Sequence, residues 1–226
     1  MFKKLFGRGA RGAAPFYRPY RNDAMNHIYN LLFCDNPVLF SQSEAIESDL
    51  SAVLSPAADR DTLNRIANDL GVESRVRALA FNRLRSMRFS VPSKRLLGAI
   101  IEVPQNSGLD VLAIFSDQRL RYINHSETLA VFEESPPNLT AKADEVLRAS
   151  QFVVNRYGPW TQPRRPPPTG ELVRMSFLAS DGLYFGEGRF NDFFQDRFAA
   201  PVINSASELL HLVVDAALEK DRESKS

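Results

Sequence analysis

Apolar positions recur at helical spacing in the first part of the chain. In residues 59–71 they return every three or four positions, and Gly71 follows where a left-handed helix end is favoured. The same spacing is found in three further stretches: 22–33, 44–54 and 73–87. The pattern therefore predicts a helical segment over residues 22–92.

After Pro92 the apolar residues come in short runs instead. Four such runs, joined by connections of two to five residues, cover 96–103, 109–115, 120–124 and 128–132. In the third run, apolar and polar residues alternate, which is typical of a strand with one covered face. Short connections between such runs predict an antiparallel meander of four strands.

The last part of the chain predicts two long helices around a hairpin. Residues 138–157 form the first helix, and a proline-rich connector, 158–170, follows it. Apolar runs at 172–178 and 183–185 flank Asp181-Gly182, a pair that favours a tight hairpin turn. A short aromatic helix over 190–198 and a helix over 204–220 come last, the latter with Ser205 and Glu208 spaced as a capping box.

Together these elements predict an α+β fold. An N-terminal helical segment precedes an antiparallel sheet of about six strands, which packs against two or three helices within residues 93–222. The chain has 226 residues, of which 44% are apolar, enough for one ample core. This composition excludes collagen-like, disulfide-stapled and wholly disordered classes.

The charge is distributed unevenly along the chain. The net charge is +1, but residues 1–21 hold six basic residues and no acidic one. We expect these residues to form a flexible basic arm. Cys34 is the single cysteine and cannot form an internal disulfide, and no apolar run reaches the length of a membrane span. The expected location is therefore the cytoplasm.

The usual catalytic motifs are absent from the sequence. It contains neither a phosphate-binding P-loop nor a serine nucleophile elbow. The three histidines, His27, His125 and His211, lack the spacing of a zinc site. Cys34 stands seven positions after His27, about 10 Å along a helix, so a buried structural cysteine is the favoured interpretation. The sequence predicts no cofactor and no metal, and leans away from an enzyme.

One polar cluster is nevertheless a candidate site. Asp110 interrupts an apolar run, where it either faces solvent or pairs with Arg121 or Tyr122 on the neighbouring strand. His125 follows in the next turn. These four residues are the basis of a third-ranked hypothesis, a small-molecule enzyme.

Basic residues suggest a second hypothesis, a partner rich in phosphate. Residues 74–101 contain seven basic residues and no acidic one. Together with the arm, these basic residues would hold a nucleic acid or an anionic membrane surface. Pairing of the basic residues within the protein, or their simple solvation, is favoured because the segment has no base-stacking motif. Phe2, Leu5 and Phe6 allow the arm only weak peripheral membrane contact. The candidate anion-binding residues are Lys3, Lys4, Arg8, Arg75, Arg77, Arg85 and Arg88.

Five stretches of the chain together carry a resemblance to a known family: NLLFCDN (30–36), GLDVLAIFSDQRLRYINHS (108–126), RYGPW (156–160), PRRPPP (163–168) and VRMSFLASDGLYFGEG (173–188). With them, residues 22–218 resemble a family of uncharacterised bacterial proteins of about this length. That family has Asp-Gly where this chain has Asp117-Gln118, and glycine where it has Glu127. The resemblance implies a bacterial, cytoplasmic, single-unit protein and carries no activity or site residue.

The favoured function is non-catalytic. We expect a cytoplasmic interaction or regulatory protein, of the kind of an adaptor or an immunity protein, that presents its sheet or the aromatic region 183–198 to a protein partner. The candidate partner-binding residues are Trp160, Tyr184 and Phe185. The proline-rich connector contains a PxxP pattern, Pro163–Pro166, which is interpreted as part of a stiff spacer in preference to a ligand for another domain.

Overall fold

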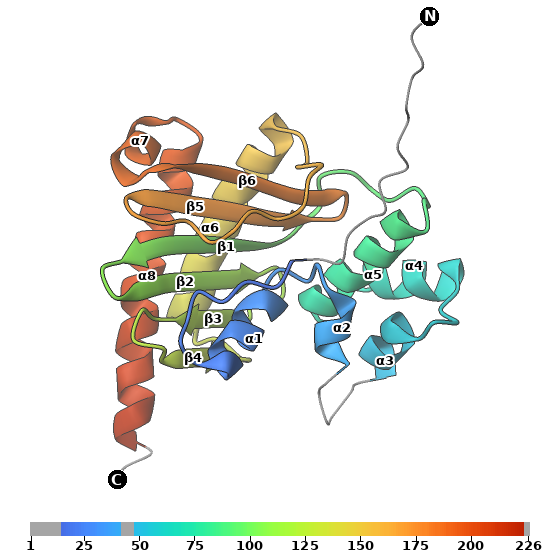
Figure 1. Ribbon diagram of the computed structural model, residues 1–226, viewed down its shortest axis with the longest axis horizontal. Helices are drawn as coiled ribbons and strands as arrows, with labels where there is room; N and C mark the ends of the chain where they lie inside the picture. Colours follow the sequence, from blue (N-terminus) through green and yellow to red (C-terminus); the bar gives the residue numbers. More distant parts are fainter. Residues whose placement is uncertain (1–14, 42–47, 224–226) are drawn as a thin grey trace, which may run out of the picture.

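The computed structural model describes residues 15–41 and 48–223. Five helices come first in this part of the chain (Figure 1): α1 (Asp23–Leu31), α2 (Pro37–Phe40), α3 (Ser48–Leu54), α4 (Arg60–Asn68) and α5 (Ser74–Ser86). They confirm the predicted helical segment and add α2, a single turn that was not expected. Residues 44–47 of the predicted helix 44–54 lie outside the described residues.

A six-stranded antiparallel sheet follows, as predicted. Its spatial order is β4-β3-β2-β1-β5-β6, so the late hairpin pairs with the first strand of the meander. The strands are β1 (Leu96–Gln105), β2 (Gly108–Phe115), β3 (Leu120–Ile123), β4 (Leu129–Phe132), β5 (Leu172–Ala179) and β6 (Gly182–Arg189). Strand β6 continues past the predicted end at residue 185, through Gly186 and Gly188, to Arg189.

Helices cover both faces of this sheet (Figure 1). On one face lie α6 (Pro137–Arg156) and α8 (Ala199–Glu223), with the short α7 (Phe190–Gln195) beside them, and on the other lie the N-terminal helices. Val111 and Ala113 of β2 point into the core below the N-terminal helices, whereas Leu112 and Ile114 point toward α6 and α8. Because both faces are covered, the central strands are almost continuously apolar.

The last residues of the predicted arm are part of the fold. The side chain of Tyr20 is buried and its hydroxyl donates to the backbone carbonyl of Leu109 at 3.0 Å. The backbone N–H groups of Arg21 and Asn22 both donate to the carboxylate of Glu127 at 2.8 Å. The end of the predicted arm, Tyr20 and Arg21, is therefore bound to the sheet and to the turn between β3 and β4. Residues 1–14, with Lys3, Lys4 and Arg8, lie outside the described residues.

Helix α8 begins five residues before its predicted start at residue 204. The cap is Asp196, whose carboxylate accepts the backbone N–H groups of Phe198 and Ala199, both at 2.8 Å. The hydroxyl of Ser205 instead donates to the carbonyl of Pro201 one turn back, at 2.7 Å. The capping box predicted at Ser205 is therefore wrong, because the helix already runs through it.

Candidate functional site

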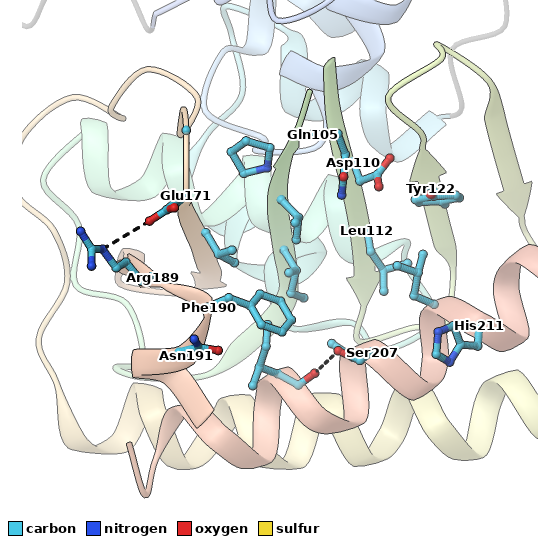
Figure 2. A pocket seen from close by; sticks show the side chains of 18 residues that line it. Gln105, Asp110, Leu112, Tyr122, Glu171, Arg189, Phe190, Asn191, Ser207 and His211 are labelled. Atoms are coloured by element: carbon cyan, nitrogen blue, oxygen red, sulfur yellow. Dashed lines mark hydrogen bonds and ion pairs between the residues drawn. The ribbon is translucent and has the colours of Figure 1, made fainter. Parts of the chain in front are cut away.

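A cavity of about 640 Å³ lies between the sheet and α8 (Figure 2). Its sheet wall is apolar and comes from neighbouring strands: Ile101 and Val103 of β1, Leu112 of β2 and Val173 of β5. Ile203 and Leu210 of α8 form the opposite wall, and Phe190 of α7 closes one end. The cavity is therefore an apolar space between the sheet on one side and α8 on the other.

Polar side chains surround this cavity on several sides. Figure 2 shows Asp110 and Tyr122 on the strands at one end, and Glu171 and Arg189 at the other. The guanidinium of Arg189 lies 3.6 Å from the carboxylate of Glu171, and both side chains are largely exposed. Ser207 and His211 lie on the α8 side. The two ends of the cavity therefore differ: one ends in an ion pair and the other in Asp110.

Asp110 is the centre of the predicted polar cluster. Its carboxylate accepts the backbone N–H of His125 at 2.7 Å and lies 3.0 Å from the His125 Nδ1. Burial, followed by the charge of Asp110 and a hydrogen bond to it, raises the pKa of Tyr122 to about 12. The side chain of Asp110 is 13% exposed, so it faces the cavity and not bulk solvent. The predicted contact between Asp110 and Tyr122 is present.

Arg121 does not belong to this cluster. It neighbours Tyr122 along β3 and therefore points to the opposite face of the sheet. There its guanidinium is buried, donates to the carbonyl of Leu120 at 2.9 Å and pairs with Glu133. The expected pairing of Asp110 with Arg121 is wrong, because consecutive side chains of a strand point to opposite faces of the sheet and Arg121 lies on the face away from Asp110.

His125 lies beside the cavity rather than inside it. Its side chain is 44% exposed and lines a second hollow, between β4 and the later turns of α8, with Tyr122 between the two hollows. A carboxylate that orients an imidazole is an arrangement suited to a general base. The structure thus brings Asp110, Tyr122 and His125 together, and the enzyme hypothesis that depends on them stays a prediction.

The structure uses most of the predicted anion-binding arginines inside the fold. Arg75 pairs with Glu73 and lies over the ring of Phe115. Arg77 is 4% exposed, and Arg85 donates to the carbonyl of Ser180 at 2.5 Å. Of the four arginines predicted on this segment, Arg88 alone is exposed.

Cys34 is buried, as predicted, and Arg83 on α5 is bound within the fold. The thiol of Cys34 is buried, and that burial raises its pKa, which makes it a poor nucleophile. Arg83 falls on the apolar side of its helix, and its guanidinium donates to the carbonyls of Val53 and Ser55. Among the residues that the structure describes, no three histidine, cysteine, aspartate or glutamate side chains gather as metal ligands would.

The aromatic candidates are divided between surface and core. Trp160 is 40% exposed, and its ring meets the half-buried ring of Phe185 edge to face at 5.0 Å. Tyr184 is 2% exposed and donates its hydroxyl to Asp181 at 3.0 Å, so its side chain is not accessible to a partner. This is a correction: consecutive residues of β6 point to opposite faces, and Tyr184 points into the core.

Beside β6 lies an aromatic groove, defined here by Val153, Tyr157, Phe193 and Phe198 around a floor of Met175 and Phe177. Its volume is about 390 Å³. Gly186 and Gly188 of β6 face the ring of Phe193, which would lie 3.7–3.8 Å from a β-carbon at either position. The absence of side chains on these glycines leaves the groove open along the strand.

The outer edge of β6 is largely unpaired. The carbonyl of Leu183 accepts the backbone N–H of Trp160 at 2.7 Å, which shows that Leu183 directs its backbone groups away from β5. Alternate residues of a strand share this direction, so Phe185, Glu187 and Arg189 do the same. The described part of the chain provides no backbone partner for the outward N–H and C=O groups of Phe185 and Glu187.

A buried charged network on the opposite face of the sheet was not predicted. Glu102 of β1 is fully buried and accepts the hydroxyl of Tyr29 at 2.7 Å, with Arg174 of β5 3.9 Å away. Arg174 also pairs with Glu187 and donates to the carbonyl of Pro166 in the connector at 2.6 Å. These residues come from distant parts of the chain, and their only local signal is a charge within an apolar strand.

The proline-rich connector lies across this network. Arg164 is 5% exposed, pairs with Asp35 at 2.7 Å and lies with its guanidinium 3.9 Å from the centre of the Phe33 ring. The hydroxyl of Tyr17 donates to the Arg164 carbonyl at 2.5 Å. The connector is thus bound within the protein itself, in agreement with its interpretation as a spacer.

Comparison with known proteins does not name a relative. No protein-family model, no curated protein and no solved structure matches the chain. Among the described helices, none is both long and apolar enough to cross a membrane. The features of the structure that bear on function are the cavity, the aromatic groove and the edge of β6.

Proposed function

We propose that the protein is a cytoplasmic, non-catalytic interaction protein that binds an extended segment of a partner protein along β6. The observation that carries the proposal is the unpaired edge of β6 beside the aromatic groove. An exposed strand edge is a ready template for another strand, and natural proteins usually protect it. Here no described backbone segment covers the edge beyond Leu183.

Main-chain hydrogen bonds would supply the first part of the binding. The outward N–H and C=O groups of Phe185 and Glu187, and the N–H of Arg189, fit a strand added to the sheet. The connector holds the start of β6 through Trp160, and β5 pairs with it along its full length. Because the edge is already ordered, binding costs little conformational entropy on this side.

The aromatic groove would supply specificity. Alternate side chains of an added strand would point toward the sheet face on which the groove opens, where the half-buried rings of Phe193 and Phe198 offer apolar contact. Tyr157 and Trp160 are 52% and 40% exposed at the surface near the edge. Aromatic residues of this kind carry much of the binding energy in protein interfaces.

A substitution at Arg189 tests strand addition directly. Arg189 has a φ of −68°, which proline adopts without strain, and its outward N–H is not used within the sheet. Arg189→Pro should therefore leave the fold intact and remove one edge donor. Arg189→Ala is the matched control, because it removes the same side chain and its surface contact with Glu171 but keeps the N–H.

The measurement begins with linear peptides selected on the full-length protein from a displayed library. We expect the best peptide to bind the alanine variant as it binds the wild type, and to bind the proline variant about tenfold more weakly, a loss of about 1.4 kcal/mol. Hydrogen exchange at the amides of Phe185 and Glu187 should slow in the complex. Equal binding by all three proteins, or protection elsewhere in the molecule, would contradict the proposal.

A further inference from the structure

We propose that the cavity between the sheet and α8 is a binding site for a small amphiphilic amine. Its hydrocarbon body would lie against Leu112 and Ile203, and its protonated amino group would lie beside Asp110 and Tyr122. Arg189, the last residue of β6, lines the far end of this cavity, but the amino group is assigned to the end formed by Asp110, so the inference does not depend on the interaction proposed above.

The size and walls of the cavity suit an apolar ligand body. A volume of about 640 Å³ falls within the range of small-molecule sites, roughly 300–1,000 Å³. Strand side chains form one wall and α8 the other, so a chain or ring placed between them loses contact with water on both sides. Each methylene transferred there would tighten binding by about fourfold at most.

The charge of the cavity selects the ligand's head group. Asp110 has His125 as its only ion-pair partner in the described residues, and His125 does not line this cavity. Arg189 lines the opposite end, where Glu171 lies beside it. His211 of α8 also lines the cavity, and Asp110 is the carboxylate at this end. A carboxylate next to the ring of Tyr122 is a combination that binds ammonium groups.

A series of ligands that differ only in the head group tests this inference without any substitution. Octylamine, octanol and octanoate would be titrated into the full-length wild-type protein near pH 7, with binding measured by calorimetry and by NMR shifts of the cavity methyl groups. We expect octylamine to bind at least about tenfold more tightly than octanoate, with octanol between them. Equal affinities, or shifts that avoid Leu112 and Ile203, would overturn the proposal.

Two variants then locate the charge that matters. Asp110→Asn removes the charge but keeps an oxygen that can accept the N–H of His125, and it should weaken octylamine binding about tenfold while leaving octanol unchanged. Glu171→Gln removes an equal charge at the opposite end and should change neither affinity by more than about twofold. Retention of full octylamine affinity by Asp110→Asn would exclude the assigned position of the amine. If that variant does not fold, the ligand series on the wild type decides the question.

Discussion

Gln118 and Glu127 share a backbone conformation that side chains rarely adopt. Their φ angles are 66° and 68°, in the left-handed region that favours glycine. The side chain of Gln118 is exposed. Its backbone N–H donates to the carbonyl of Phe115, and its carbonyl accepts the hydroxyl of Ser135. Glu127 differs, because its carboxylate holds the backbone of Arg21 and Asn22.

Substitution by glycine should therefore have opposite effects at the two positions. Gln118→Gly relieves the conformational cost and should raise the free energy of unfolding by about 0.5–1 kcal/mol. Glu127→Gly relieves the same cost but removes both hydrogen bonds to the N-terminal segment, so it should lower that free energy by about 1 kcal/mol. Urea unfolding monitored by circular dichroism measures both, and a shift of both midpoints in one direction would refute the role given to Glu127.

Glu102 makes the stability of the protein depend on pH. Burial raises the pKa of this carboxyl above its ordinary value of 4.5, although Arg174 acts in the opposite direction. Below that ordinary value both the folded and the unfolded states are protonated. As the pH rises, the unfolded chain loses the proton first, so the contribution of Glu102 to stability decreases until the pH exceeds its folded-state pKa.

Glu102→Gln should remove this dependence, because the amide stays neutral and still offers an oxygen to Tyr29. The free energy of unfolding of the variant, relative to the wild type, should therefore increase as the pH is raised from about 4 toward neutrality. Urea titrations at a series of pH values measure that difference. If the difference in the free energy of unfolding between variant and wild type stays constant or falls as the pH rises, the prediction is wrong. The partners of Glu102 would then offset the cost of burying its charge.

Helix α8 starts at Ala199 in the structure, whereas the sequence pattern predicts a start at residue 204. Asp196→Ala removes the side chain that caps the first turn and should destabilise the protein by about 1 kcal/mol. Ser205→Ala removes only a bond to the carbonyl of Pro201 within the helix and should change stability by less than about 0.5 kcal/mol. Thermal unfolding of the two variants gives the comparison. The reverse order of effects would restore a helix that starts at residue 204.

The elements that could be predicted are those whose pattern is local. Alternating and continuous apolar runs identified all six strands, and the contact of Asp110 with Tyr122 follows from their positions on neighbouring strands. Gly186 and Gly188 hid the second half of β6, because glycine is uncommon in strands and its presence indicates a turn or loop. The cavity could not be predicted, because it depends on where α8 crosses the sheet.

The proline-rich connector joins parts of the protein that are far apart in the sequence. Arg164 contacts Phe33 and Asp35 after α1 and also donates to the side chain of Asn30 at 2.9 Å. Its neighbour Arg165 lies half-exposed and pairs with Glu187 of β6 at 2.9 Å. Two adjacent arginines of one PxxP pattern thus have different environments, which offers a matched comparison.

Arg164→Met should destabilise the protein by about 3 kcal/mol, because it leaves Asp35 without its cation and breaks the link between the connector and the N-terminal helices. Arg165→Ala should cost less than about 1 kcal/mol, as expected for an exposed ion pair.

Equilibrium unfolding in urea, followed by both near- and far-ultraviolet circular dichroism, measures these costs and also shows whether sheet and helices unfold together. Adding Asp35→Asn to Arg164→Met should recover at least about 1 kcal/mol, since the buried charge is then removed with its partner. Equal costs for the two arginine variants would mean that the prolines alone hold the connector. A single transition in the wild type that splits into two in Arg164→Met would identify this arginine as the residue that makes the helical segment and the sheet one cooperative unit.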